Sequence, residues 1–357
     1  MTIIILFVLF QIVPIDTITI KNVVEIGASS DEYQLVSTSF VSTTPNNDIV
    51  ITDRRTNLIS IINYQGDIIQ EFGGRGRGPG EFTEITSVEH LPDGRLLVYD
   101  RMSRRFSKIK LGDGSFETTP IDTKTIFSIW EMQYYGNSIL ARFEDVSGNP
   151  YQPLKSDFLL HYTDNLFKSI KNSIISIDQL TGNSKFEKQI ITSPRGFRYL
   201  KMNNNIWISP FVYRGFLYNF NSDGELIGKI KGYKNIEKPF EELEEDEASN
   251  FTRVYRSFGS EGRFFNIVNS QSVGLIEYKN HILHFSTFWE NDTPKIVLDI
   301  FDKSGTLKNS FTIKNALSVA NTSSSIPFKI MHSSENKIYA IDSSVNTNLL
   351  KVFELDF

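Results

Sequence analysis

Arginine residues gather in three short segments of the first third of the 357-residue chain. A guanidinium group carries a rigid fork of N–H donors, which fits two oxygens of a carboxylate, sulfate or phosphate. If the fold brings the three segments to one face, they form a local anion site on a protein of net charge -5. The members of this candidate patch are Arg54, Arg55, Arg75, Arg77, Arg101, Arg104 and Arg105.

A structural role for the same arginines is the alternative. Asp53-Arg54 and Asp100-Arg101 occupy equivalent places in successive repeats, which indicates an ion pair or a turn hydrogen bond copied with the repeat. Exposed guanidinium groups are more often solvated or ion-paired than functional. A surface ion pair contributes only about 0–1 kcal/mol to stability. Three further carboxylates that could neutralise the arginines are Glu71, Glu81 and Glu84.

The five histidines do not have the spacing of a metal site. His90 and His332 each stand ten residues before an aspartate that ends a predicted strand, so they occupy equivalent positions near the centre of the fold. A zinc site needs at least a third protein ligand, and the sequence offers no clear one. His281 and His284 are three apart on a predicted strand and therefore face opposite ways. We predict no metal, with His90 and His332 as weak candidates only.

Other chemical functions lack their characteristic residues. The sequence contains no G-x-S-x-G, H-E-x-x-H, Walker or EF-hand motif, so no nucleophile is indicated. The absence of cysteine excludes disulfides, thiolate metal sites and thiol catalysis. The acidic net charge gives no whole-protein attraction to nucleic acid. We therefore predict no cofactor and no nucleic-acid partner.

The glycine-rich stretch EFGGRGRGPGEF, residues 71–82, shares only its composition with a phosphate-binding loop. Such a loop needs a following helix whose N-terminus faces the anion, and TEITSVEHLPDG reads as a strand and a turn. We interpret the stretch as a tight connection between two repeated units, in which glycine supplies the unusual backbone dihedrals.

These residues are positioned by a repeated pattern of strands. Each unit has an apolar run after a turn rich in Asn, Gly, Asp or Pro, then a second run, and in five units a tight turn and a further strand. The unit recurs every ~58 residues, which is typical of four-stranded antiparallel propeller blades. The six first runs are NDIVITD, GRLLVYD, NSILARF, NNIWISP, NHILHFS and NKIYAID.

The two ends of the chain complement each other. The sixth unit ends at LLKVFELDF without its last strand, and ITIKNVVEIG, residues 18–27, has the alternation of that missing strand. Pairing the two would close a ring and remove exposed strand edges. The sequence therefore predicts an all-β, six-bladed β-propeller over residues 17–357, closed by its N-terminal strand.

The segment from Asp53 to Ile109, from DRRTNLISII to DRMSRRFSKI, resembles the NHL-repeat type of propeller. It resembles more closely the NHL-like six-bladed propellers common in the cell envelope of Bacteroidota. The strongest motifs cover about a fifth of the chain, so the resemblance implies a fold. It implies no single activity, because NHL-type propellers include binding modules and a lyase.

One segment departs from the repeat. In EKPFEELEEDEASNFTRVYRSFGSEG, residues 237–262, apolar residues recur with helical spacing and acidic residues fill the first half. The sequence predicts a helical insertion between blades four and five. A packed amphipathic helix and a lid or docking element are both open as its role.

The N-terminal region has an apolar run from Ile3 to Ile15. It is too short to span a bilayer comfortably but fits the apolar core of an export signal, and a buried first strand is the alternative. We predict that residues 1–16 are an export signal or anchor and that the protein is periplasmic or in the cell envelope. Any contact with membrane would be through this segment if it is not cleaved.

The scaffold and the missing catalytic motifs favour a non-enzymatic binding module with a protein, peptide or glycan ligand. The alternative is a lyase or hydrolase, possibly metal-dependent, that uses His90 and His332 at the hub.

Overall fold

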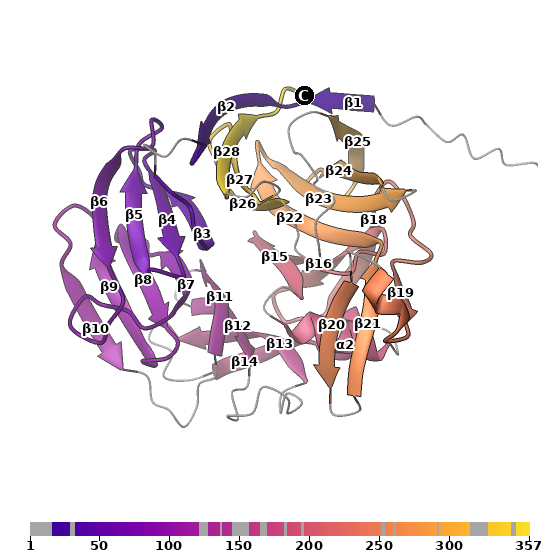
Figure 1. The fold of residues 1–357 in the computed structure, drawn as a ribbon, viewed down its shortest axis with the longest axis horizontal. Helices are drawn as coiled ribbons and strands as arrows, with labels where there is room; N and C mark the ends of the chain where they lie inside the picture. Colours follow the sequence, from indigo (N-terminus) through magenta and orange to yellow (C-terminus); the bar gives the residue numbers. More distant parts are fainter. Residues whose placement is uncertain are drawn as a thin grey trace, which may run out of the picture.

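The computed structural model describes residues 16–28, 33–120, 128–135, 138–144, 157–164, 170–181, 184–193, 196–250, 254–259, 262–290, 293–314, 328–343 and 348–357. Six antiparallel sheets stand around a common centre, and each forms one blade (Figure 1). The innermost strands of the six sheets surround the middle of the ring. The prediction of a six-bladed propeller with four-stranded blades is confirmed.

The first three blades follow one another along the chain. Blade one contains β3 (Thr38–Thr43), β4 (Ile49–Asp53), β5 (Leu58–Ile62) and β6 (Ile68–Gly73). Blade two contains β7 (Ile85–His90), β8 (Arg95–Asp100), β9 (Arg105–Lys110) and β10 (Phe116–Pro120). Blade three contains β11 (Ser128–Tyr135), β12 (Ser138–Glu144), β13 (Phe158–Asp164) and β14 (Ile170–Ser176). Two short helices follow blade three, α1 (Ile177–Leu180) and α2 (Lys185–Thr192).

The last three blades complete the ring. Blade four contains β15 (Phe197–Met202), β16 (Asn205–Pro210), β17 (Phe216–Asn221) and β18 (Leu226–Lys231). Blade five contains β22 (Ser270–Tyr278), β23 (His281–Glu290), β24 (Thr293–Phe301) and β25 (Leu307–Lys314). Blade six contains β26 (Phe328–Ser334), β27 (Lys337–Asp342) and β28 (Leu349–Glu354), and its fourth strand is supplied from the other end of the chain.

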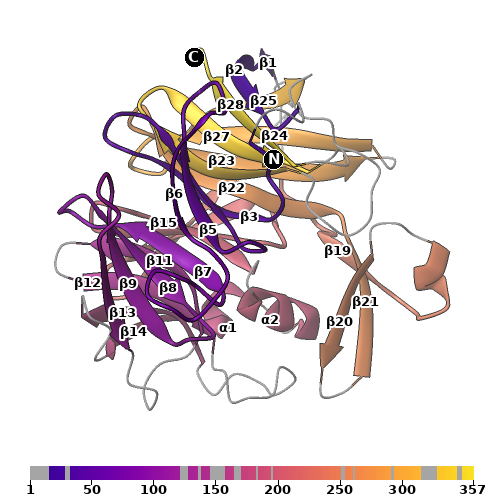
Figure 2. The ribbon, with the colours of Figure 1, turned by 60° about the vertical axis from the view of Figure 1, so that its left-hand side comes forward.

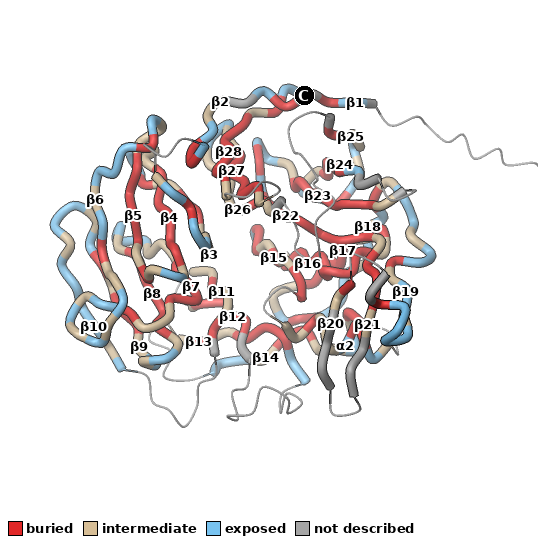
Figure 3. Tube along the Cα trace, viewed as in Figure 1, coloured by how far each residue is buried: buried red, intermediate tan, exposed pale blue. Residues whose placement is uncertain are grey.

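Both faces of a blade are buried, which explains why the sequence shows short apolar runs instead of strict alternation. In β4, Ile49 and Ile51 pack toward blade six, in a cluster with Tyr339, whereas Val50 packs toward blade two, in a cluster with Val98. Successive side chains of one strand thus enter two different clusters. In blade one, burial is highest in the two middle strands, β4 and β5, and falls to the outer strand β6, which is largely exposed (Figure 3).

The N-terminal segment joins two blades at their outer edge. β2 (Lys21–Ile26) pairs antiparallel with β28, which confirms that an N-terminal strand is the fourth strand of blade six. β1 (Asp16–Thr19) lies parallel to β25 and adds a fifth strand to blade five. The predicted strand over residues 18–27 is therefore divided between two sheets.

The predicted helical insertion is wrong. Residues 237–262 contain β19 (Phe240–Leu243), the 3-10 helix η1 (Glu247–Asn250) and β20 (Val254–Gly259), and β20 continues into β21 (Gly262–Val268). β21 pairs with both other strands in a small separate sheet that stands beside the ring (Figure 2).

Tertiary pairing overrode the local helical pattern of this segment. The partner strand β21 lies almost entirely beyond residue 262, so the pairing could not be seen within the predicted helix. Val254, Ile267 and Ala248 pack in one cluster, while Tyr255 contacts the ring of Phe211 edge-on at 5.3 Å. The insertion is therefore anchored on the loop between β16 and β17 of blade four.

The predicted export segment, residues 1–16, lies outside the described residues apart from Asp16. Among the residues that the structure does describe, no helix has the length and apolar character needed to cross a bilayer.

Removal of residues 17–28 should strongly destabilise the protein. It deletes three buried isoleucines, Ile18, Ile20 and Ile26, each of which contributes about 1.5–3 kcal/mol by burial, and it exposes the edge of β28. The free energy of unfolding, measured in urea, should fall by about 5 kcal/mol or more. Unchanged unfolding of the truncated protein would contradict closure by the N-terminal strand.

Two point variants of β2 provide a matched comparison. Ile26 is 1% exposed and Val23 is 38% exposed on the same strand. Ile26→Ala should lower the free energy of unfolding by about 2–5 kcal/mol and Val23→Ala by about 0.5 kcal/mol. Equal effects would mean that β2 is not packed as the structure has it.

Candidate functional site

The six inner strands enclose a central cavity of about 600 Å³. Every one of them, β3, β7, β11, β15, β22 and β26, contributes lining residues. The inner strands β3 and β7 both begin at the same end of the cavity. Thr38 at the start of β3 is paired with Asp53, and Ile85 at the start of β7 is paired with Asp100, so Arg54 and Arg101 both lie at this end. We call this end the mouth.

At the mouth, two arginines from successive blades hold one carboxylate. Arg54 Nη2 lies 2.9 Å from Glu84 Oε1, and Arg101 Nη2 lies 2.6 Å from Glu84 Oε2. Arg101 Nε also donates to Glu84 Oε2 at 2.8 Å. The carboxylate side chain is only 18% exposed, so these charge-assisted contacts are largely shielded from solvent.

The same two guanidinium groups lie against Trp130, which belongs to the third blade. Their Cζ atoms are 5.5 Å (Arg54) and 5.1 Å (Arg101) from the centre of the indole ring. Guanidinium groups are attracted to the negative face of an aromatic ring, most strongly for Trp. Arg54 and Trp130 both line the cavity. Side chains from three blades thus build the mouth.

The recurring aspartates set this arrangement through turn hydrogen bonds. Asp53 accepts from the backbone N–H groups of Ser37 at 2.6 Å and Arg55 at 2.8 Å. Burial by itself raises the pKa of Asp53, but these bonds and one from Thr56 hold it below its usual value. Asp100 accepts in the same way from Thr83 and Glu84, at 3.0 Å each. Of the two structural alternatives, the turn hydrogen bond is the one observed.

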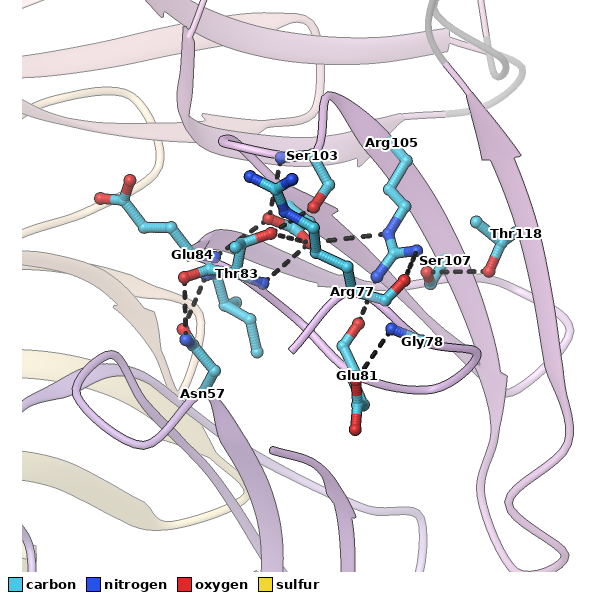
Figure 4. Close-up of polar contacts among 12 residues, drawn as sticks. Asn57, Arg77, Gly78, Glu81, Thr83, Glu84, Ser103, Arg105, Ser107 and Thr118 are labelled. Carbon is cyan, nitrogen blue, oxygen red and sulfur yellow. Dashed lines mark hydrogen bonds and ion pairs between the residues drawn. The ribbon is translucent and has the colours of Figure 1, made fainter. Parts of the chain in front are cut away.

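Arg105 supports the glycine-rich loop (Figure 4). Its guanidinium group donates to the carbonyl oxygens of Glu81 and Arg77, the latter at 3.4 Å, and its Nε lies 3.6 Å from Asp100. The loop also folds on itself, because Glu81 accepts from the N–H of Gly78 at 2.8 Å. A Cβ atom on Gly76 would lie 1.9 Å from the Glu81 carboxylate, so a larger residue there would displace this side chain from Gly78. The loop is a structural connection, as interpreted from its sequence.

The remaining four arginines of the predicted patch are exposed: Arg55, Arg75, Arg77 and Arg104. In the part of the chain that the structure describes, their side chains make no ion pair or hydrogen bond. The seven residues therefore have three different environments: two at the cavity mouth, one in a structural network and four facing solvent.

The two hub histidines lie on either side of β3. His90 Nε2 is 2.7 Å from Ser42 Oγ, and His332 Nε2 is 3.5 Å from Thr43 Oγ1. Burial lowers the pKa of both, and for His332 burial together with the nearby His90 lowers it to about 4, so both are neutral at pH 7. Among the described residues, no three His, Asp or Glu side chains are grouped to hold a metal ion.

Trp130 and Glu89 are among the cavity residues that sequence analysis did not single out. Burial raises the pKa of Glu89 to about 8, against a hydrogen bond from the N–H of Tyr134 at 3.0 Å, and the nearby Glu131 raises it further. Their position in the repeat could have identified them, because each residue lies on the innermost strand of its blade.

Comparisons with known proteins agree on the architecture. A family model described as "6-bladed beta-propeller" matches residues 29–340. A Bacteroides fragilis protein that is inferred to be exported superimposes with a TM-score of 0.56 at 13% identity, covering 96% of this chain and 99% of that one. A Bacteroides thetaiotaomicron protein of unknown function gives 0.52 at 11% identity, covering 96% and 73%.

The comparisons do not extend to activity. Virginiamycin B lyase from Staphylococcus aureus has a TM-score of only 0.42 at 13% identity, covering 90% of this chain and 98% of the lyase, which supports no argument about function. No curated protein matches the sequence.

Arg105 and the exposed arginines should respond differently to substitution. Arg105→Ala leaves the carbonyl groups of Arg77 and Glu81 without this donor and removes the ion pair with Asp100, so the free energy of unfolding should fall by about 1–3 kcal/mol. The double variant Arg75→Ala/Arg77→Ala should stay within about 0.5 kcal/mol of the wild type. Urea unfolding checks both. A strongly destabilised double variant would show that the loop arginines are structural.

Glu89 should make stability fall as the pH rises. Its pKa is raised from 4.5 to about 8 on folding, so the native state holds a proton that the unfolded state has lost. The stabilisation is complete below pH 4.5 and is lost as pH approaches 8. Glu89→Gln should therefore raise the free energy of unfolding, relative to wild type, by about 1–3 kcal/mol more at pH 8 than at pH 5.

The exposed carboxylate Glu117, which is paired with Arg95 on the blade surface, is the control for this experiment. Glu117→Gln should have nearly the same small effect at both pH values. If the effect of Glu89→Gln were also independent of pH, Glu89 would not be protonated in the folded protein.

Proposed function

The chain belongs to the six-bladed β-propeller family that matches residues 29–340, and on this premise we propose that it is a non-enzymatic binding module of the bacterial envelope. The ligand site is the mouth of the central cavity. The observation that carries the proposal is the cluster of Arg54, Arg101 and Glu84 against Trp130, at the entrance to a cavity of about 600 Å³. That volume is within the range of pockets that hold small ligands.

The cluster has the chemistry of a recognition site. Aromatic and arginine side chains bury large contact areas and give directional hydrogen bonds, which is why they dominate binding hot spots. They are held here by backbone-anchored turns on rigid blades, so little order is lost when a ligand binds. Export is supported by the apolar N-terminal run and by the inferred export of the Bacteroides fragilis neighbour.

A hub-sited lyase or hydrolase has less support. His332 lines the cavity, but His90 is not among its lining residues and is hydrogen-bonded to Ser42. Ser42 is buried and, like His90, is not among the residues that line the cavity, so this Ser-His pair does not face a ligand bound there, as acyl transfer would require.

Binding should be detected with a small panel of polymers and lost when the mouth is changed. The panel consists of poly-L-glutamate, polygalacturonate, dextran and poly-L-lysine, tested by isothermal titration calorimetry. At least one should bind the wild type, and Arg54→Ala/Trp130→Ala should weaken it at least tenfold. Arg95→Ala is the matched control, because Arg95 is also ion-paired but begins β8, at the opposite end of the strand from Arg101.

Two results would count against the proposal. Binding that survives in the double variant would place the ligand elsewhere on the propeller. Failure of all four polymers to bind would remove the support for a binding module at this mouth.

A further inference from the structure

We propose that the ligand of this site is an acidic carbohydrate that presents a uronate, a sugar ring with a carboxylate directly attached. This inference rests on the proposed function and specifies the ligand class of the same site. The juxtaposition that points to it is a guanidinium group, an indole ring and an unpartnered hydroxyl at one cavity mouth.

Arg54 supplies the donor for the carboxylate. Only its Nη2 is used for Glu84, and a guanidinium group has five N–H donors. Within the described residues its other nitrogens have no hydrogen-bond partner, and its side chain is 37% exposed while lining the cavity. A second carboxylate can therefore bind to Arg54 without loss of the existing ion pair.

The trio at the mouth also retains positive charge. Two guanidinium groups share the single carboxylate of Glu84, so one positive charge is left uncompensated within the group. This residual charge favours an anion over a neutral ligand, and the attraction is screened over about 10 Å at 0.1 M salt.

Trp130 lies beside both guanidinium groups and also lines the cavity, and the part of its indole that faces the cavity offers an apolar surface for the ring. A pyranose presents C–H groups on one face, and these pack well on the electron-rich face of an aromatic ring. In a uronate the carboxylate is one bond from the ring, so the two parts are held close together. Arg54 Cζ lies 5.5 Å from the indole centre, which matches a ligand with this short separation. A glutamate side chain offers a carboxylate but no ring to cover the indole.

Hydroxyl groups beside Arg54 complete the match. Thr38 pairs with Asp53, next to Arg54, and lines the cavity. Its Oγ1 is buried and has no hydrogen-bond partner in the described part of the chain. Most buried polar atoms in proteins are hydrogen-bonded, so this hydroxyl is a group that a ligand or a water molecule in the cavity can satisfy. Ser37, Ser39 and Ser343 also line the cavity, and sugar hydroxyls both donate to and accept from such groups.

The test compares three ligands of similar size: trigalacturonate, its neutral counterpart galactotriose, and the tripeptide of glutamate. A hyaluronan tetrasaccharide adds a second kind of uronate. Calorimetry at 50 and 300 mM NaCl should show that a uronate oligosaccharide binds at least tenfold more tightly than galactotriose and triglutamate, and more weakly at high salt. Arg54→Ala and Trp130→Ala should each weaken binding at least tenfold, and Arg95→Ala should leave it unchanged.

A substitution at Glu84 should change the affinity for uronate in the opposite direction. Glu84→Gln removes the internal negative charge and should increase uronate affinity about threefold to tenfold, with no increase for galactotriose. Its thermal unfolding is measured in parallel, and Arg54→Lys, which keeps the charge but not the fork of donors, should still weaken binding.

The outcomes separate this inference from the proposed function. Binding of triglutamate or galactotriose as tight as that of the uronates, with loss in Arg54→Ala, overturns the ligand class and leaves the mouth as a binding site. Uronate binding that is insensitive to Arg54→Ala and Trp130→Ala overturns both. Failure of both uronates to bind overturns the ligand class, while the polymer panel decides the function.

Discussion

The pairing of the two chain ends is the constraint on which the rest of the molecule depends. Each blade packs against both of its neighbours, so neither face of its sheet is exposed and its position in the ring is fixed. Blade six obtains its fourth strand only from β2, and Ile26 of that strand enters the cluster that also contains residues of blade one. The cavity exists because the six inner strands are held at fixed distances by this packing. Loosening one blade would therefore change the shape of the central site.

Turn hydrogen bonds of two aspartates also hold the residues of the mouth in place. Asp53 and Asp100 end the second strands of blades one and two, and each fixes the backbone before its own inner strand through N–H groups. The next residues, Arg54 and Arg101, are thereby placed at equivalent points in adjacent blades. Their common partner Glu84 lies just before the inner strand of blade two. The repeat thus generates a pair of guanidinium groups at one end of the cavity.

Electrostatic properties differ along the cavity. The mouth holds a shared carboxylate with two guanidinium groups, whereas Glu89, near the other end of its inner strand, is protonated at neutral pH because burial raises its pKa. The hub histidines are neutral for the same reason. Buried groups in the hub therefore avoid charge by retaining or losing protons. The two guanidinium groups of the mouth, in contrast, keep their charge and are partly exposed, at 37% for Arg54 and 28% for Arg101, and this separation is the basis for the proposed anion site.

The sequence alone determined the blade count, the order of strands within each blade, the use of an N-terminal strand for the last blade and the structural nature of the glycine-rich loop. These features depend on local signals, namely apolar runs, turn residues and a constant repeat. It could not separate Arg54 and Arg101 from Arg105, nor place Trp130 beside them, because those contacts join residues of different blades. The same reason explains the insertion, where a helical pattern was overruled by pairing with β21. Side-chain partners across blades depend on the packed ring, and only the tertiary structure decides them.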